Sequence, residues 1–239
     1  MKQNPMTLVP LKSAGLALLL ATIVPAIAQS NKDPYPAMAP LAQYLMERDA
    51  EIALARSAAP ASVSADAEVM VLGTDGYTTA VKGSNGFLCI VERGWAAASD
   101  NPDFWNPKLR GPLCLNPSAA RSFEPIYLMR TKLVLQGKSK AEIVQATQAS
   151  LDSKELPALE PDAMCYMLSK QQYLGDGPKS WHPHLMFFVS GDAAKSWGGN
   201  EPGSPVIAAN FPEERVTIFM VVVSKWSDGT PGPVDDHAH

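Results

Sequence analysis

The most constraining feature of the sequence is the segment 215–226 (RVTIFMVVVSKW), in which both alternating sets of side chains are largely apolar. One set contains Val216, Ile218, Met220 and Val222, and the other contains Phe219, Val221 and Val223. Successive side chains of a strand point to opposite faces, so a strand with two apolar sets must be covered on both sides. The segment therefore predicts a strand that is buried on both faces of a sheet.

Other short strands are expected on both sides of the middle of the chain. Residues 68–92 contain the apolar segments EVMVLG, TTAV and GFLCIVE, separated by Asp75-Gly76 and Asn85-Gly86. These dipeptides tolerate the positive φ angles of tight hairpins, which predicts a three-stranded antiparallel meander. A second group of strands is expected at 164–169, 184–190 and 205–209, before the segment 215–226.

A helix and a long loop are expected around the first group of strands. Apolar residues recur at helical spacing after Pro40, which suits a first helical turn, so we expect a helix over 40–57. Asn-Pro and Gly-Pro pairs in 95–116 predict a long irregular loop. We expect Phe104 and Trp105 to pack this loop against the core.

Further helices are expected between the two groups of strands. The pattern predicts helix over 117–136 with an interruption at Pro125. Ser139 and Glu142 have the spacing of a capping box, which predicts a helix over 139–152. The expected fold class is therefore α+β: a mostly antiparallel sheet of about seven strands with an N-terminal helix and a central helical insertion.

The N-terminus has the layout of a secretory signal peptide. A basic start is followed by the apolar run 14–24 and by Ala26-Ile27-Ala28, a small-x-small cleavage signal. We expect a signal peptide over 1–28 with cleavage before Gln29, because the apolar run is too short to span a bilayer. The protein is then expected to be exported, to the periplasm or outside the cell, with no membrane span after cleavage.

The 211 residues that would follow cleavage fit one domain. We expect a flexible arm over 29–37, a single α+β domain over 38–228 and a flexible acidic and histidine-containing tail over 229–239. Without Lys2 and Lys12 the chain carries 18 basic and 24 acidic residues, a net charge of about −6. No basic stripe remains for phosphate backbones, so nucleic acid is not an expected partner, and the sequence leaves the oligomeric state open.

Three cysteines would enter an oxidising compartment, and an odd number leaves at least one without an internal partner. The favoured disulfide joins Cys89 and Cys114, because it would restrain the loop between them. Cys165 is then the candidate free thiol.

Four stretches resemble an uncharacterised group of exported bacterial proteins. They are SAAPASVSADAEVMVLG, KGSNGFLCIVER, MCYMLS and HPHLMFFV. The similarity covers most of the chain after the leader. It implies export and brings no assigned substrate, cofactor or catalytic residue.

The segment HPHLMFFV raises the question of a metal site. In a strand, His182 and His184 share one face, and two imidazoles on one face can bind one ion. A zinc or copper site would need a third ligand, from Cys165, an aspartate or a glutamate. The alternative is that His184 is a hydrogen-bonded, partly buried residue and His182 lies in a loop. We expect the other face, Leu185, Phe187 and Val189, to anchor the strand in the core.

The sequence leaves two classes of function open. The first is a binding or envelope-associated module, because no motif for a common hydrolase, zinc protease, nucleotide enzyme or calcium module is present. The second is an enzyme that depends on a metal at His182 and His184, or on a Cys165 nucleophile with one of these histidines as its base. The catalytic residues themselves are not assigned by the sequence.

Overall fold

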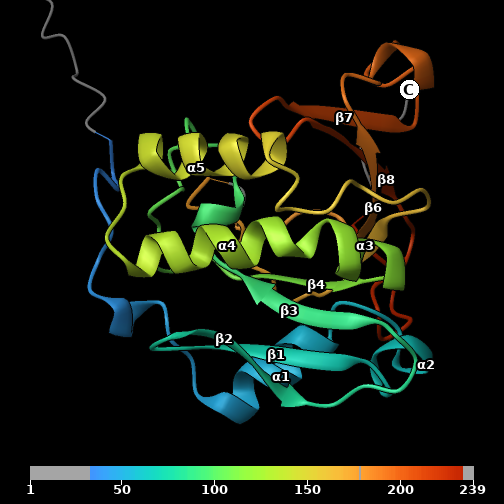
Figure 1. The fold of residues 1–239 in the computed structure, drawn as a ribbon. Helices are drawn as coiled ribbons and strands as arrows, with labels where there is room; N and C mark the ends of the chain where they lie inside the picture. Colours follow the sequence, from blue (N-terminus) through green and yellow to red (C-terminus); the bar gives the residue numbers. More distant parts are fainter. Residues whose placement is uncertain (1–32, 178, 234–239) are drawn as a thin grey trace, which may run out of the picture. The chain divides into compact units, whose positions relative to one another are not determined.

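The α+β prediction is confirmed in the computed structural model, which describes residues 33–177 and 179–233 (Figure 1). These residues form one compact unit built around an eight-stranded sheet, one strand more than about seven. The strand order is β2-β1-β3-β4-β5-β6-β8-β7, and every neighbouring pair is antiparallel except β1 with β3. No helix among the described residues has both the length and the apolar character needed to cross a membrane.

The strands are joined by turns, by longer loops and, between β4 and β5, by a helical insertion. Their bounds are β1 Glu68–Gly73, β2 Gly76–Val81, β3 Leu88–Glu92, β4 Gly111–Leu115, β5 Met164–Met167, β6 His184–Ser190, β7 Val206–Phe211 and β8 Val216–Val222. The α-helices are α1 Arg48–Arg56, α2 Ala61–Ser64, α3 Pro117–Ser122, α4 Glu124–Leu135 and α5 Lys140–Asp152. Three short 3-10 turns lie at Leu41–Gln43, Gly94–Ala96 and Lys195–Trp197.

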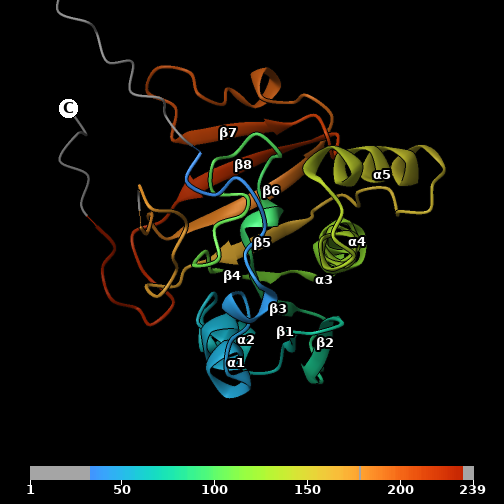
Figure 2. The ribbon, with the colours of Figure 1, turned by 90° about the vertical axis from the view of Figure 1, so that its left-hand side faces the viewer.

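The helices form layers on the sheet. Figure 2 shows α4 and α5 together on one side, while α1 and α2 lie next to β1 and β3. The larger core cluster includes Ile90, Leu113, Leu115, Tyr127 and Phe188. A smaller cluster joins apolar residues of α1 to the opposite face of the strands that carry Cys89 and Cys114. The inner part of the sheet is therefore covered on both faces.

The disulfide predicted between Cys89 and Cys114 is confirmed. The two residues lie directly opposite each other in the antiparallel register of β3 and β4, and their sulfur atoms are bonded at 1.96 Å. Cys165 is free and buried.

The prediction of one helix over 40–57 is wrong. Leu41–Gln43 form a 3-10 turn, and α1 begins only at Arg48, where the Glu47 side chain accepts a hydrogen bond from the Ala50 N–H. Tyr44 lies between the two helical pieces, and its hydroxyl donates to the Trp105 carbonyl at 2.8 Å. Burial of Tyr44 and capping by Glu47 together override the helical spacing of the apolar residues.

The predicted meander over 68–92 is also wrong, because β3 pairs with β1 in parallel instead of with β2. The hairpin at Asp75-Gly76 forms as expected. Gly83 passes so close to the start of β1 that an added Cβ would lie 2.1 Å from the Glu68 nitrogen. The Asn85 side chain donates to the Val63 carbonyl at 2.7 Å. The connection is thus held across the start of β1, and it delivers β3 to the far side of that strand.

The segment 95–116 is not loop throughout, since residues 111–115 form β4 between β3 and β5. Pro112 is tolerated inside this strand because β5 pairs with β4 only at Cys114 and Leu115. The packing role expected of Phe104 and Trp105 is confirmed, as both side chains are buried.

The central helices follow the sequence signals closely. The Asn116 side chain caps α3, and the break before α4 falls at Phe123, so that Pro125 lies in the first turn of α4, where its missing N–H costs little. The capping box of Ser139 and Glu142 is confirmed at the start of α5.

Candidate ligand pocket

A pocket of about 400 Å³ lies between α4 and one face of the sheet. Most of its wall is apolar. The side chains that form this wall include Leu113, Ile126, Met186, Phe188, Ile218 and Met220. Such a volume and lining are typical of sites for small organic molecules.

Strand register explains why these side chains meet. Met186 lies opposite Met220 and Phe188 opposite Ile218 in the pairing of β6 with β8, and residues directly opposite point to the same face. The facing wall is formed by Phe123, which precedes α4, and by Ile126, Tyr127 and Arg130, which follow helical spacing on α4. The ring of Phe123 stacks on Phe188 with centroids 4.0 Å apart, which joins helix and sheet.

The expected roles of the two faces of β6 are reversed. His184 and Phe188 are the buried residues and line the pocket, whereas Leu185, Phe187 and Val189 are only partly buried. The expectation that these three residues anchor the strand in the core is therefore wrong. The face carrying His184 packs toward α4 and the larger core cluster, and this packing decides its burial.

His184 is hydrogen-bonded, as the alternative interpretation of the sequence expected, and it is fully buried where that interpretation expected partial burial. Its Nδ1 lies 2.7 Å from the His182 carbonyl oxygen, and its ring contacts Trp181 with centroids 4.6 Å apart. Burial lowers the pKa of His184, so the ring is neutral at neutral pH. Because Nδ1 must carry the proton to donate to a carbonyl, Nε2 is left as an acceptor.

In the described part of the chain, no group of three or more His, Cys, Asp or Glu side chains is arranged to hold a metal ion. His237 and His239 of the predicted tail lie outside the described residues, as does the predicted signal peptide. The zinc or copper site at His182 and His184 stays a prediction.

Cys165 and His184 lie on the same face of neighbouring strands. Met167 is opposite His184 in the pairing of β5 with β6, and Cys165 is two residues from Met167. Burial, followed by the charges of Glu92 and Glu124, raises the pKa of Cys165 well above its ordinary value. The thiol is therefore the form present at neutral pH, whereas a nucleophile reacts as the thiolate. The cysteine nucleophile also stays a prediction.

An ion pair stands in the wall of the pocket. Arg130 of α4 donates to the carboxylate of Glu214, which precedes β8, and to the Ala97 carbonyl at 2.7 Å. The two side chains are only 3% and 6% exposed. Burial raises the pKa of Glu214, against the opposing effect of the Arg130 charge.

Glu92 is a further ionisable group of the pocket wall, at the end of β3. Burial raises its pKa to about 8, although the charge of Arg130 opposes this shift. Within 33–177 and 179–233, no residue donates a hydrogen bond to the Glu92 carboxyl or forms an ion pair with it. Glu92 therefore presents an unpartnered carboxyl to an apolar pocket.

A second carboxyl, that of Glu124, is buried at the start of α4. Burial and then the charge of Glu92 raise its pKa well above the ordinary value. Neither of its oxygens has a hydrogen-bond partner among the described residues. Glu92 and Glu124 thus disfavour each other's ionisation, and Glu124 is held in its neutral form.

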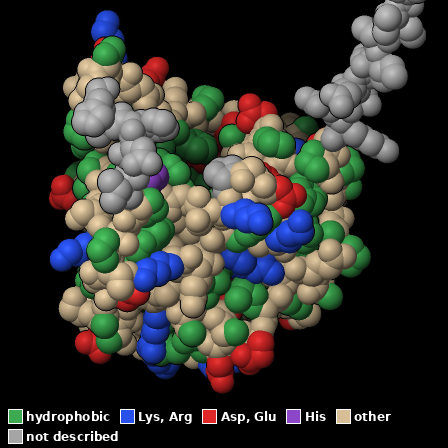
Figure 3. Space-filling view, turned by 180° about the vertical axis from the view of Figure 1, so that it is seen from behind, with side chains coloured by type: hydrophobic (Ala, Val, Ile, Leu, Met, Phe, Trp, Pro, Cys, Tyr) green, Lys and Arg blue, Asp and Glu red, His purple; other side chains and the backbone are tan. Residues whose placement is uncertain are grey.

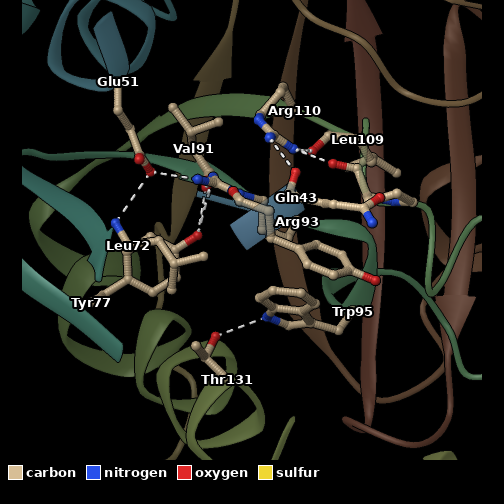
Figure 4. A network of polar contacts seen from close by, with 12 residues as sticks. Gln43, Glu51, Leu72, Tyr77, Val91, Arg93, Trp95, Leu109, Arg110 and Thr131 are labelled. Carbon is tan, nitrogen blue, oxygen red and sulfur yellow. Dashed lines mark hydrogen bonds and ion pairs between the residues drawn. The ribbon is translucent and has the colours of Figure 1, made fainter. Parts of the chain in front are cut away.

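Figure 4 shows a polar network around Arg93, a residue that also lines the pocket. Arg93 donates from Nε to the Tyr44 carbonyl and from Nη2 to the Glu51 carboxylate, each at 2.8 Å. Glu51 also accepts from the Leu72 N–H at 3.2 Å. The charge of Arg93 is thereby matched within the protein, on the α1 side of β3.

Sequence reasoning missed Glu92, Glu124, Arg130 and Glu214. A signal for two of them was present, because Glu92 ends the apolar run GFLCIVE and Arg130 shares the helical spacing of Ile126 and Tyr127. A charge on an apolar face is a pattern that indicates a functional or paired group.

Comparisons of the chain with protein families, with curated proteins and with solved structures found no match. The resemblance to exported bacterial proteins is therefore still a prediction.

Proposed function

We propose that this protein binds a small, mainly apolar molecule in the pocket between α4 and the sheet. The observation that carries the proposal is an apolar pocket of about 400 Å³ whose wall also contains the unpartnered carboxyl of Glu92 and the ion pair of Arg130 with Glu214. An apolar wall supplies affinity through the hydrophobic effect, and a few polar groups supply orientation.

We also propose that the protein acts after export, in the periplasm or outside the cell. The signal-peptide layout of residues 1–28 supports this location, and so does the Cys89–Cys114 disulfide, since disulfides persist in oxidising compartments. Cell fractionation with an antibody to the protein tests it. Accumulation of the uncleaved chain in the cytoplasm would contradict the proposal.

Basic and acidic side chains are both scattered over the face shown in Figure 3. We therefore keep a small molecule as the proposed partner, in line with the net negative charge of the chain.

The pocket is tested by filling it. The neutral probe N-phenyl-1-naphthylamine becomes fluorescent in apolar sites, and the purified protein is expected to bind it in a saturable way. The substitution Met186→Trp places an indole in the pocket and is expected to abolish this binding. Leu185→Trp is the matched control, because the neighbouring residue of β6 lies on the opposite face and is also partly buried.

Both variants are checked for folding by their thermal unfolding, since an overpacked site can lose about 1–3 kcal/mol. Equal probe binding by wild type, Met186→Trp and Leu185→Trp would show that the pocket is not the binding site. Absence of saturable binding by the wild type would contradict the proposal.

A metal-dependent or cysteine-dependent enzyme is the second proposal. The position of Cys165 and His184 on one face of neighbouring strands supports it. The raised pKa of Cys165 weighs against the cysteine mechanism, so we place the binding function first.

A further inference from the structure

We infer that the pocket selects a protonated amine with an apolar body, whose ammonium group pairs with the carboxylate of Glu92. This inference rests on the proposed binding function and names the chemical class of its ligand. It follows from the charges of the pocket wall, from the groups around Glu92 and from the aromatic lining.

The charges of the wall leave one acidic group unmatched. The described ionic side chains of the lining are Glu92, Arg93, Arg130 and Glu214. Arg130 is paired with Glu214, and Arg93 is paired with Glu51 behind the wall. Only Glu92 lacks a counterion among these groups, so a ligand with one positive charge completes the set.

The groups around Glu92 determine what its carboxyl does in the empty pocket. From α4, Arg130 favours its ionisation, while Glu124 opposes it. From β5, Cys165 is a neutral thiol, and from β6, His184 is a neutral imidazole. Burial outweighs the single cation, and Glu92 is mainly protonated at neutral pH.

An arriving ammonium group reverses this balance. The carboxyl gives its proton to the solvent, and the carboxylate that remains forms a charge-assisted hydrogen bond with the ammonium group. Below the pKa of Glu92, one molecule of amine bound should therefore release close to one proton. A neutral ligand or an anion would not cause this release.

The aromatic lining also favours a cation. The rings of the wall belong to Phe123, Tyr127, Trp181, Phe188 and Phe211. The negative face of an aromatic ring attracts an ammonium group within about 6 Å. An anionic head group would instead meet the carboxyl groups of Glu92 and Glu214, and Arg130 is already paired with Glu214.

The experiment compares three ligands with the same apolar chain: octylamine, 1-octanol and octanoate. Each displaces N-phenyl-1-naphthylamine from the purified protein at neutral pH, and octylamine is expected to bind about tenfold or more tightly than 1-octanol. Glu92→Gln keeps the shape of the side chain and is expected to remove this preference. Glu201→Gln is the matched control, because Glu201 is exposed and lies outside the pocket.

Isothermal titration in buffers of different ionisation enthalpy measures the protons released on binding. Octylamine should release close to one proton at about pH 6, and its affinity should rise with pH up to about 8. Both effects should be absent in Glu92→Gln.

The outcomes separate the inference from the proposed function. Equal binding of octylamine and 1-octanol, or the same preference in Glu92→Gln, would overturn the inference and leave the binding function intact. Tighter binding of octanoate would also overturn it. If the wild type bound neither the probe nor any of the three ligands, the proposed function would fail as well.

Discussion

Arg93 and Glu51 form an ion pair of 2.8 Å in which the two side chains are 0% and 1% exposed. Glu51 belongs to α1 and Arg93 follows β3, so this pair fixes the N-terminal helix to the sheet (Figure 4). Removal of one partner leaves a buried charge without compensation. Glu51→Ala is therefore expected to lower the free energy of unfolding by about 3–5 kcal/mol, measured by urea denaturation.

The exposed pair of Arg121 with Glu160 is the control for this prediction. Its side chains are 60% and 37% exposed, and Glu160→Ala should cost much less stability than Glu51→Ala. A double variant that replaces both Arg93 and Glu51 with methionine should be more stable than Glu51→Ala, because no unpaired charge remains. Equal losses at Glu51 and Glu160 would argue against a structural role for the buried pair.

The state of the cysteines gives a second prediction. The native protein without reductant should resist alkylation, since Cys165 is buried and its raised pKa keeps it a thiol. The unfolded, unreduced protein should take up one alkyl group per chain, and the reduced protein should take up three, measured by mass. Rapid alkylation of Cys165 in the native state would instead favour the cysteine nucleophile.

Local signals in the sequence predicted elements whose stability depends on nearby residues. The capping box of Ser139 and Glu142 is an example, because both partners lie within one helical turn. The strand at 184–190 and the pairing of Cys89 with Cys114 were also predicted correctly. The prediction of one helix over 40–57 was wrong because Tyr44 is buried against Trp105, a residue far along the chain.

Strand neighbours and pocket residues depend on contacts that a sequence pattern does not contain. Asn85-Gly86 suits a tight hairpin, yet the Asn85 side chain bonds to Val63 and directs β3 to the other side of β1. The choice of the buried face of β6 depends on the position of α4, so the sequence pattern assigned Leu185, Phe187 and Val189 to the core. Glu92 and Glu124 interact although they lie in different elements, at the end of β3 and at the start of α4.

Metal analysis separates the two proposed functions in a third prediction. The purified protein, truncated before Asp235 to remove the tail histidines, is expected to contain no stoichiometric zinc or copper if it is a binding protein for small molecules. The measurement is elemental analysis after purification without an affinity tag. Stoichiometric metal that disappears in the double variant His182→Ala, His184→Ala would support the metal-dependent enzyme instead. Unchanged metal in that variant would exclude these two histidines as ligands.

The raised pKa values of Glu92 and Glu124 predict that stability falls as the pH rises. The pKa of Glu92 is raised to about 8, and that of Glu124 is raised as well, so the folded state holds protons that the unfolded chain loses near the ordinary pKa of 4.5. Stability from the neutral carboxyls is fully present below about pH 4.5 and is lost progressively up to about pH 8.

Urea denaturation between about pH 5 and pH 8 measures this loss. Glu92→Gln and Glu124→Gln should each reduce the loss of stability with rising pH, because the amide that replaces the carboxyl is neutral and does not titrate. Asp228 is the control, because hydrogen bonds from Thr230 and Lys170 lower its pKa instead of raising it. Asp228→Asn should therefore leave the slope of stability against pH in this window unchanged. A stability that rises with pH over the same range in the wild type would show that Glu92 and Glu124 are ionised in the folded protein.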